Sequence, residues 1–162
     1  MLAVAHGKFE LFEQSLGKQL IDMDLRVRKY NRTETTLNGT IFIRQTMDDT
    51  LILNTDVFFS ALGNQQFQHL PMHLPTSGFC QFMTHLHDEY PNVIKDIANI
   101  TEAEECPVSE RAMIISDKTF PSEVLPPKLT KGLWKMVVTG TIDGEEVLKY
   151  YMVARLFEDN HF

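Results

Sequence analysis

Apolar and polar residues alternate along much of the first half of the chain, with the period of two that is typical of β-strands with one buried face. Between residues 21 and 27 every second residue is apolar and the others are charged, which predicts a half-buried strand. Two further strands are predicted around residues 40–45 and 51–59, joined by a hairpin at residues 47–49. The strand at 51–59 carries apolar residues on both faces, which indicates a central strand or one that lines a space.

The period changes in the middle of the chain. Apolar residues between positions 79 and 90 recur at intervals of three and four, the spacing of an amphipathic helix. Ser77 is placed to cap the first turn, because its hydroxyl can accept hydrogen bonds from amides there. Pro91 ends the helix, since the residue before a proline avoids the helical conformation. Residues 92–98 allow one further short helical turn.

The last third of the chain returns to strands. A short apolar strand is predicted at residues 112–116, and the prolines in residues 125–129 predict an extended connection. Strands at 133–142 and 145–157 flank Asp143-Gly144, a pair that favours a two-residue hairpin turn because glycine tolerates positive φ. We therefore expect a mainly β protein, an antiparallel β-sandwich with one short helix inserted mid-chain.

Residues 1–7 are interpreted as the remnant of a signal peptide, because Ala3 and Ala5 have the spacing of a signal-peptidase site. A flexible N-terminus is the alternative. No repeat, low-complexity tract or linker divides the remainder, so residues 8–162 are expected to form a single domain.

Three N-x-Thr sequons, at Asn31, Asn38 and Asn99, indicate glycosylation and the secretory route. The chain has two cysteines, Cys80 and Cys106, which are either one disulfide or two buried thiols. Together these features predict a secreted, extracellular glycoprotein.

Charge argues against nucleic acid as a partner. The chain has 15 Lys and Arg against 22 Asp and Glu, a net charge of −7, whereas nucleic-acid binding depends on basic residues. The basic cluster at residues 26–32 is interpreted as the solvated face of a strand. No apolar run approaches the ~20 residues that span a bilayer.

The sequence gives no positive reason for an enzyme. It contains no Gly-x-Ser-x-Gly elbow, no phosphate-binding loop and no dinucleotide-binding glycine pattern. His85 and His87 point about 200° apart on a helix, so they cannot chelate one ion together. His69 and His73 have a suitable spacing, but Pro71 argues against a helix there. We expect no catalytic centre, no metal site and no cofactor.

A set of sequence blocks, in a characteristic order across roughly residues 20–157, resembles an insect family of secreted proteins. That family is related to the ganglioside-activator protein and to ML lipid-recognition domains, and it includes the chemosensory CheA and CheB proteins and a sister group of unknown function. The blocks are residues 37–42, 48–49, 62–65, 70–75, 79–82, 105–107 and 125–135, and the closest match to the ganglioside-activator branch lies in Cys106-Pro107, Leu125-Pro126, Gly132 and Asp143-Gly144.

The resemblance implies a cup-shaped sandwich around an apolar cavity and a Cys80–Cys106 bridge. It also implies a protein that holds or presents a lipid or other hydrophobic small molecule, with a membrane surface or a receptor protein as a further partner. The mammalian activator has several bridges and this chain has two cysteines, so the ligand class does not transfer.

Apolar side chains in excess of simple alternation are the candidates for the cavity wall, and methionine among them adapts to varied ligand shapes. The alternative is that they simply fill the core. The helix at 79–90 and the loop at 62–74 are the expected lids. The candidates are Phe58, Phe59, Phe67, Met72, Phe79, Phe82, Met83, Trp134, Met136 and Tyr151, together with Tyr150 and Met152.

Two classes of function remain open. The first is a carrier of lipids or hydrophobic semiochemicals, or a lipid-presenting cofactor for an enzyme. The second is an extracellular protein-interaction module with a filled core, whose Phe58 face or acidic surface binds a partner. A cavity above about 300 Å³ would favour the first class.

Overall fold

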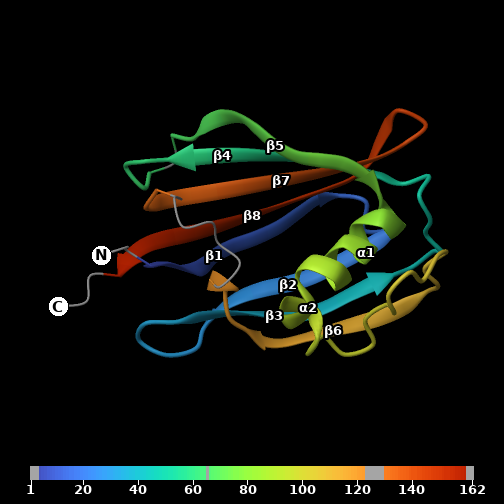
Figure 1. The fold of residues 1–162 in the computed structure, drawn as a ribbon, viewed down its shortest axis with the longest axis horizontal. Helices are drawn as coiled ribbons and strands as arrows, with labels where there is room; N and C mark the ends of the chain where they lie inside the picture. The colour runs from blue at the N-terminus through green and yellow to red at the C-terminus, as the bar shows by residue number, and fades with distance from the viewer. Residues whose placement is uncertain (1–3, 65, 123–129, 160–162) are drawn as a thin grey trace.

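The computed structural model describes residues 4–64, 66–122 and 130–159, and the side chains of residues 4–5, 72–74 and 158–159 are outside this description. Within these ranges the chain is an antiparallel β-sandwich with two short helices (Figure 1). The fold class expected from the sequence is therefore confirmed.

The larger sheet has five strands, and its two edges are formed by the first and fifth strands of the chain. Each neighbouring pair is antiparallel. In spatial order the strands are β1 (Val4–Leu16), β8 (Glu145–Asp159), β7 (Gly132–Ile142), β4 (Ile52–Ser60) and β5 (Gln68–Gly78).

The smaller sheet has three strands, β2 (Ile21–Lys29), β3 (Thr35–Ile43) and β6 (Arg111–Lys118), in that order. Strand β1 contacts β2, so the two sheets come together along this edge (Figure 1). Helix α1 (Phe79–Glu89) and the short helix α2 (Pro91–Ile94) lie in front of the strands, over one end of the sandwich.

Elements with a strong local pattern are confirmed. The alternation at residues 21–27 forms β2, and the helical spacing after residue 79 forms α1. Strands β7 and β8 form the expected hairpin, in which Asp143 and Gly144 have φ values of 52° and 81°. The second helical turn is α2, which begins at Pro91.

The hairpin expected at residues 47–49 is wrong. Strand β3 pairs with β2 and β6, whereas β4 pairs with β5 and β7, so the segment between β3 and β4 crosses from one sheet to the other. Met47 anchors this crossing, because its amide and carbonyl both bond to the backbone of Val108, at 2.9 and 2.7 Å. Periodicity identifies a strand and its buried face, but it does not identify the strand's partner.

The loop expected at residues 62–74 is also wrong in its second half. From Gln68 the chain forms β5, which pairs with β4 alone and is the edge of its sheet. Proline lacks an amide hydrogen, and an edge strand tolerates this where a central strand does not. Pro71 and Pro75 therefore mark an edge strand and not a loop.

The N-terminal strand has no counterpart among the sequence predictions. Residues 1–3 lie outside the described part of the chain, but from Val4 the backbone pairs with β8 as far as Leu16. The register shifts between Phe9 and Leu11, which breaks the simple alternation of apolar residues. The connection expected at residues 125–129 lies outside the described residues.

Candidate functional site

An apolar cavity of about 200 Å³ lies between the two sheets beneath α1. Its floor is the inner face of the smaller sheet. Successive inward-facing residues of β2 and β3, and one residue of β6, form this wall, because alternate residues of a strand point to the same side. They are Ile21, Met23, Ile41, Ile43 and Met113.

Helix α1 closes the cavity from above with residues at the spacing that the sequence predicted. Phe79, Phe82, Met83 and Leu86 all line the space, and Phe79 and Met83 are buried. Residues three and four apart share one side of a helix, so a single face of α1 covers the cavity.

The remaining wall comes from the larger sheet and from the segment after α1. Strand β4 contributes Leu53, and β8 contributes Leu148 and Tyr150. These three residues bring the inner face of the five-stranded sheet opposite β2 and β3. Beyond α1 the wall is completed by Ile94, Ile97 and Ile100.

Within the part of the chain that the structure describes, Tyr150 is the single lining residue whose side chain carries oxygen or nitrogen. Its ring stacks on Phe12 with the ring centroids 5.6 Å apart. Its hydroxyl makes no hydrogen bond within the described part of the chain. Burial raises the pKa of Tyr150 to about 12. No charged side chain lines the cavity among the described residues.

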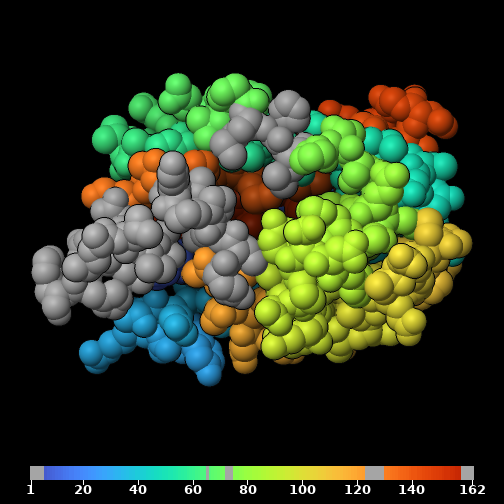
Figure 2. All heavy atoms as spheres, in the orientation of Figure 1, coloured from blue at the N-terminus to red at the C-terminus, as the bar shows by residue number. Residues whose placement is uncertain are grey.

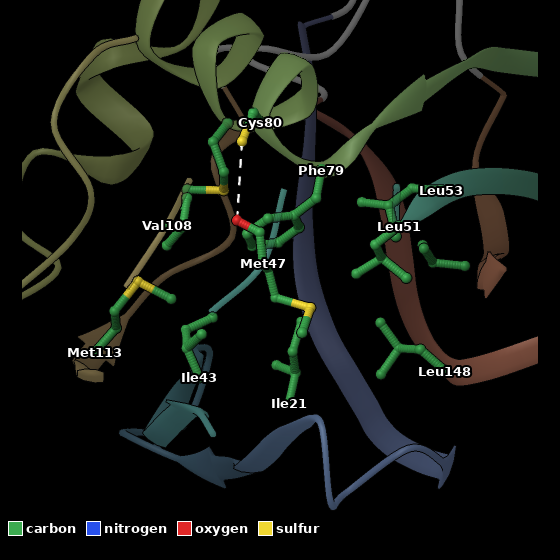
Figure 3. Close-up of a cluster of buried hydrophobic side chains, with 12 residues drawn as sticks. Ile21, Ile43, Met47, Leu51, Leu53, Phe79, Cys80, Val108, Met113 and Leu148 are labelled. Carbon is green, nitrogen blue, oxygen red and sulfur yellow. Dashed lines mark hydrogen bonds between the residues drawn. The ribbon is translucent and has the colours of Figure 1, made fainter. Parts of the chain in front are cut away.

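A tightly packed cluster borders the cavity at the disulfide end of the sandwich, and it shares several residues with the cavity wall. Figure 3 shows Phe79 and Cys80 descending from α1 toward Met47. The dashed line there joins Cys80 Sγ to the Met47 carbonyl oxygen at 4.0 Å, and because the sulfur is in a disulfide it has no hydrogen to donate. Leu51, Leu53 and Leu148 lie on one side of Met47 in this view. Ile43, Val108 and Met113 lie on the other side.

The start of α1 is held by a carboxylate from another segment. Gly78 occupies the N-cap position, so the expected cap at Ser77 is wrong. Asp49 Oδ1 accepts a hydrogen bond from the Gln81 amide at 3.1 Å, and Gln81 Oε1 accepts one from the Gly78 amide at 3.1 Å. A Cβ atom on Gly78 would lie 2.3 Å from Asp49 Oδ1, so glycine is required for this approach.

The Cys80–Cys106 disulfide is confirmed and fastens α1 to the loop before β6. That loop is fastened in turn by an ion pair between Glu105 and Arg111. The pKa of Glu105 lies below its ordinary value because its carboxylate accepts a hydrogen bond from the Glu102 amide and others from Arg111. The start of α1 is thus attached, through the disulfide and the Glu105–Arg111 ion pair, to the first residue of β6.

The described residues contain one group with the ligand types of a metal site, formed by Asp49, Cys80 and Cys106. Both sulfurs belong to the disulfide, so neither is available as a thiolate. His87 Nε2 lies 3.3 Å from the Thr101 hydroxyl. His69 Nε2 lies 3.3 Å from Asp56 Oδ1, and both of these residues belong to the larger sheet. These histidines belong to separate local contacts.

The ten residues chosen from the sequence as cavity candidates fall into separate places. Phe79, Phe82 and Met83 line the cavity. The Met72 side chain lies outside the described residues. Phe59, Trp134 and Met136 lie on the inner face of the larger sheet but outside this cavity, with the Phe59 and Trp134 ring centroids 4.6 Å apart.

Phe58, Phe67 and Tyr151 lie on the outer face of the larger sheet and therefore do not line the cavity. Lys135 Nζ lies 6.0, 5.6 and 4.5 Å from their respective ring centroids, and the Tyr151 hydroxyl donates a hydrogen bond to Glu13. We call these five residues the outer aromatic cluster. Of the two additional candidates, Tyr150 lines the cavity and Met152 packs against the second core cluster.

The sequence reasoning missed the wall supplied by the smaller sheet. Met23, Ile41 and Met113 occupy inward positions of strands that periodicity detects. A search for inward positions on every predicted strand could have found them. The choice of large aromatic residues excluded them, since isoleucine supplies much of this wall.

The three sequons differ in how the chain uses their amides. Asn31 is exposed between β2 and β3, and its Oδ1 accepts hydrogen bonds from the amide and hydroxyl of Thr33. The Nδ2 atoms of Asn38 and Asn99 donate hydrogen bonds within the chain, that of Asn99 to the Ala112 carbonyl. Among the described residues, the Nδ2 atom of Asn31 makes no such bond.

The surface is hollowed between β5 and α1 on the face seen in Figure 2. Strands β7 and β8, in orange to dark red, are visible at the bottom of this hollow. Strand β8 also carries Leu148 and Tyr150 of the cavity wall. Neither helix within the described ranges is long and apolar enough to cross a membrane.

Models of known protein families do not match this chain, and a search of curated proteins found no similar sequence.

Proposed function

We propose that this chain is a secreted, non-catalytic binding protein that holds a lipid or another hydrophobic small molecule in the cavity beneath α1. The observation that carries the proposal is a cavity of about 200 Å³ whose described lining residues are aliphatic, aromatic and thioether apart from one hydroxyl. Transfer of an apolar molecule from water into such a space is favourable by about 0.8 kcal/mol for each buried CH₂ group.

The size of the cavity restricts the ligand. Drug-sized ligands occupy pockets of roughly 300–1,000 Å³. At about 200 Å³ this cavity is below the volume of about 300 Å³ expected from the sequence for a carrier of such ligands, so that criterion is not met. An apolar cavity of about 150 Å³ nevertheless binds benzene, so a compact molecule or one end of a longer chain fits here. Burial of six to ten methylenes gives roughly micromolar affinity after the costs of association.

Several features support secretion. A disulfide is typical of proteins in oxidising compartments, and the chain carries the Cys80–Cys106 bridge. The exposed sequon at Asn31 is suited to carry a glycan. The resemblance to secreted ML-type lipid-binding proteins agrees with both, and on this basis the role lies in chemosensation or lipid handling, at a membrane surface or with a receptor.

The test is to express the protein through a eukaryotic secretory pathway and to record native mass spectra with lipid extraction of the same sample. We expect a reproducible mass excess that organic solvent releases as a fatty acid, phospholipid or hydrocarbon. A polypeptide that carries only glycan and takes up no fluorescent lipid probe would contradict the proposal.

A pair of variants on α1 links the result to the cavity. Leu86→Trp fills part of the space, whereas His85→Trp adds the same side chain at an exposed position on the same helix. We expect the first variant to lose the bound mass and the second to keep it, provided that both retain the circular dichroism of the wild type.

A second candidate function, an extracellular protein-interaction module, is favoured by the outer aromatic cluster. Aromatic residues are enriched at protein interfaces. For an interaction module of this kind, Phe58→Ala and Lys135→Glu would weaken a stable complex with a partner protein. Leu86→Trp would leave that complex intact.

A further inference from the structure

The Tyr150 hydroxyl is a polar group in an otherwise apolar space. The ring of Tyr150 lines the cavity between Leu148 and the inner face of the smaller sheet. Phe12, diagonally across on β1, stacks on the ring and offers no hydrogen-bonding group. Gln14 lies directly opposite Tyr150, and its amide is engaged with the Met23 amide and with the carbonyls of Leu16 and Ile21. The hydroxyl is also not among the fully buried polar atoms that lack a partner, so it retains access to open space.

The cavity is the open space that Tyr150 lines. Tyr150 is partly accessible, yet its ring lies in the interior of the sandwich, where burial raises its pKa. Part of its accessible surface belongs to the wall of the cavity. The hydroxyl hydrogen requires an acceptor, and the thioether sulfurs of Met23, Met83 and Met113 are weak acceptors.

An unsatisfied donor in an apolar site is costly, whereas a ligand oxygen in the right place satisfies it. Among the described residues, the same wall has no basic side chain that could neutralise a carboxylate or a phosphate. Charged head groups are therefore disfavoured inside the cavity, because an unpaired charge loses its hydration there.

We infer, on the basis of the proposed function, that the cavity selects neutral, compact molecules with a hydrocarbon body and one hydrogen-bond acceptor. Small ketones, esters and ethers are molecules of this kind. Tyr150 donates the hydrogen bond that selects them. The hydrocarbon body supplies most of the affinity. The Tyr150 hydroxyl supplies the preference for an oxygen-bearing ligand over a plain hydrocarbon of the same shape.

Acetophenone and ethylbenzene are the probes, because they have nearly the same shape and only the first has an acceptor oxygen. Affinities of both are measured by ligand-observed NMR titration of delipidated protein. The variants are Tyr150→Phe, which removes the hydroxyl and keeps the ring, and Tyr151→Phe, the matched control on the other face of the same strand. Benzoate serves as the anionic probe of similar size.

We expect Tyr150→Phe to weaken acetophenone about fivefold, the effect of one net hydrogen bond, and to leave ethylbenzene within about twofold. Tyr151→Phe should change neither affinity. This inference would be overturned if Tyr150→Phe changed the affinities for both neutral probes equally. It would also be overturned if the wild type bound benzoate more tightly than acetophenone. Either result would leave the proposed function standing. A wild-type protein that binds neither neutral probe and carries no lipid would overturn both. Thermal unfolding of each variant verifies that it is folded.

Discussion

Tyr150 and Tyr151 follow one another on β8, so their side chains lie on opposite faces of the five-stranded sheet. The Tyr151 hydroxyl donates to Glu13, and its ring lies 4.5 Å from Lys135 Nζ. The Tyr150 hydroxyl has neither kind of partner among the described residues. One residue type on one strand thus occupies two different environments.

The pKa values of the two phenols are raised for different reasons. The pKa of Tyr151 is raised first by its hydrogen bond to Glu13, which favours the protonated phenol, and then by burial. The pKa of Tyr150 is raised to about 12 by burial alone. The hydroxyl of Tyr151 is therefore satisfied from within the chain. The hydroxyl of Tyr150 has a hydrogen bond that an incoming molecule would complete.

The largest expected effect comes from the replacement of both cysteines, Cys80→Ser with Cys106→Ser. The bridge joins residues 26 apart, and loss of a loop of this size costs about 3.5 kcal/mol of unfolding free energy. Urea denaturation measures this loss. Because α1 covers only the inner face, probe binding should weaken while the alkaline titration of Tyr151 stays unchanged. A loss of stability without a loss of binding would show that α1 is not needed to close the cavity.

Neighbouring positions on β8 allow a second test. Leu148 is 2% exposed on the inner face, and Leu148→Ala should lower the unfolding free energy by about 3 kcal/mol through lost burial and an enlarged cavity. Lys149→Ala, on the outer face, should change it by less than about 0.5 kcal/mol. Similar values for the two variants in urea denaturation would contradict the assignment of the faces.

High pH should separate the tyrosines. An unfolded tyrosine ionises near pH 10.0, whereas Tyr150 in the folded protein ionises near 12, so the unfolded chain loses a proton first. The stabilisation is complete below pH 10 and is lost as the pH rises toward 12, on the order of 2 kcal/mol. Urea denaturation at pH 8 and pH 11 should show a steeper decline for the wild type than for Tyr150→Phe. An equal decline in both would mean that Tyr150 is hydrated in the folded state.

The sequence predicted the elements whose signals are local. The alternation in β2, the helical spacing of α1 and the Asp143-Gly144 turn each depend on neighbouring residues, and each is confirmed. The partner of a strand depends on distant residues instead. For that reason the change of sheet between β3 and β4 could not be predicted.

The cavity residues show the same division between local signals, which the sequence carries, and contacts between distant residues. The four lining residues from α1 share one helical face, and this local pattern identified three of them, Phe79, Phe82 and Met83, as candidates together. Phe58 and Phe59, like Tyr150 and Tyr151, were both chosen although consecutive strand residues face opposite ways. The position of the larger sheet opposite the smaller sheet shows which member of each pair faces inward.

The smallest effect should come from Lys135→Met, which keeps most of the side-chain stem and removes the charge from the outer aromatic cluster. Loss of its contacts with the rings of Phe67 and Tyr151 should lower the unfolding free energy by about 0.5–1 kcal/mol. Acetophenone affinity should stay within about twofold of the wild type, because Lys135 lies on the face opposite the cavity. Urea denaturation and the NMR titration provide the two measurements. A fivefold loss of affinity would show that the sheet transmits changes from one face to the other, and the two environments of Tyr150 and Tyr151 would then have to be treated as one coupled site.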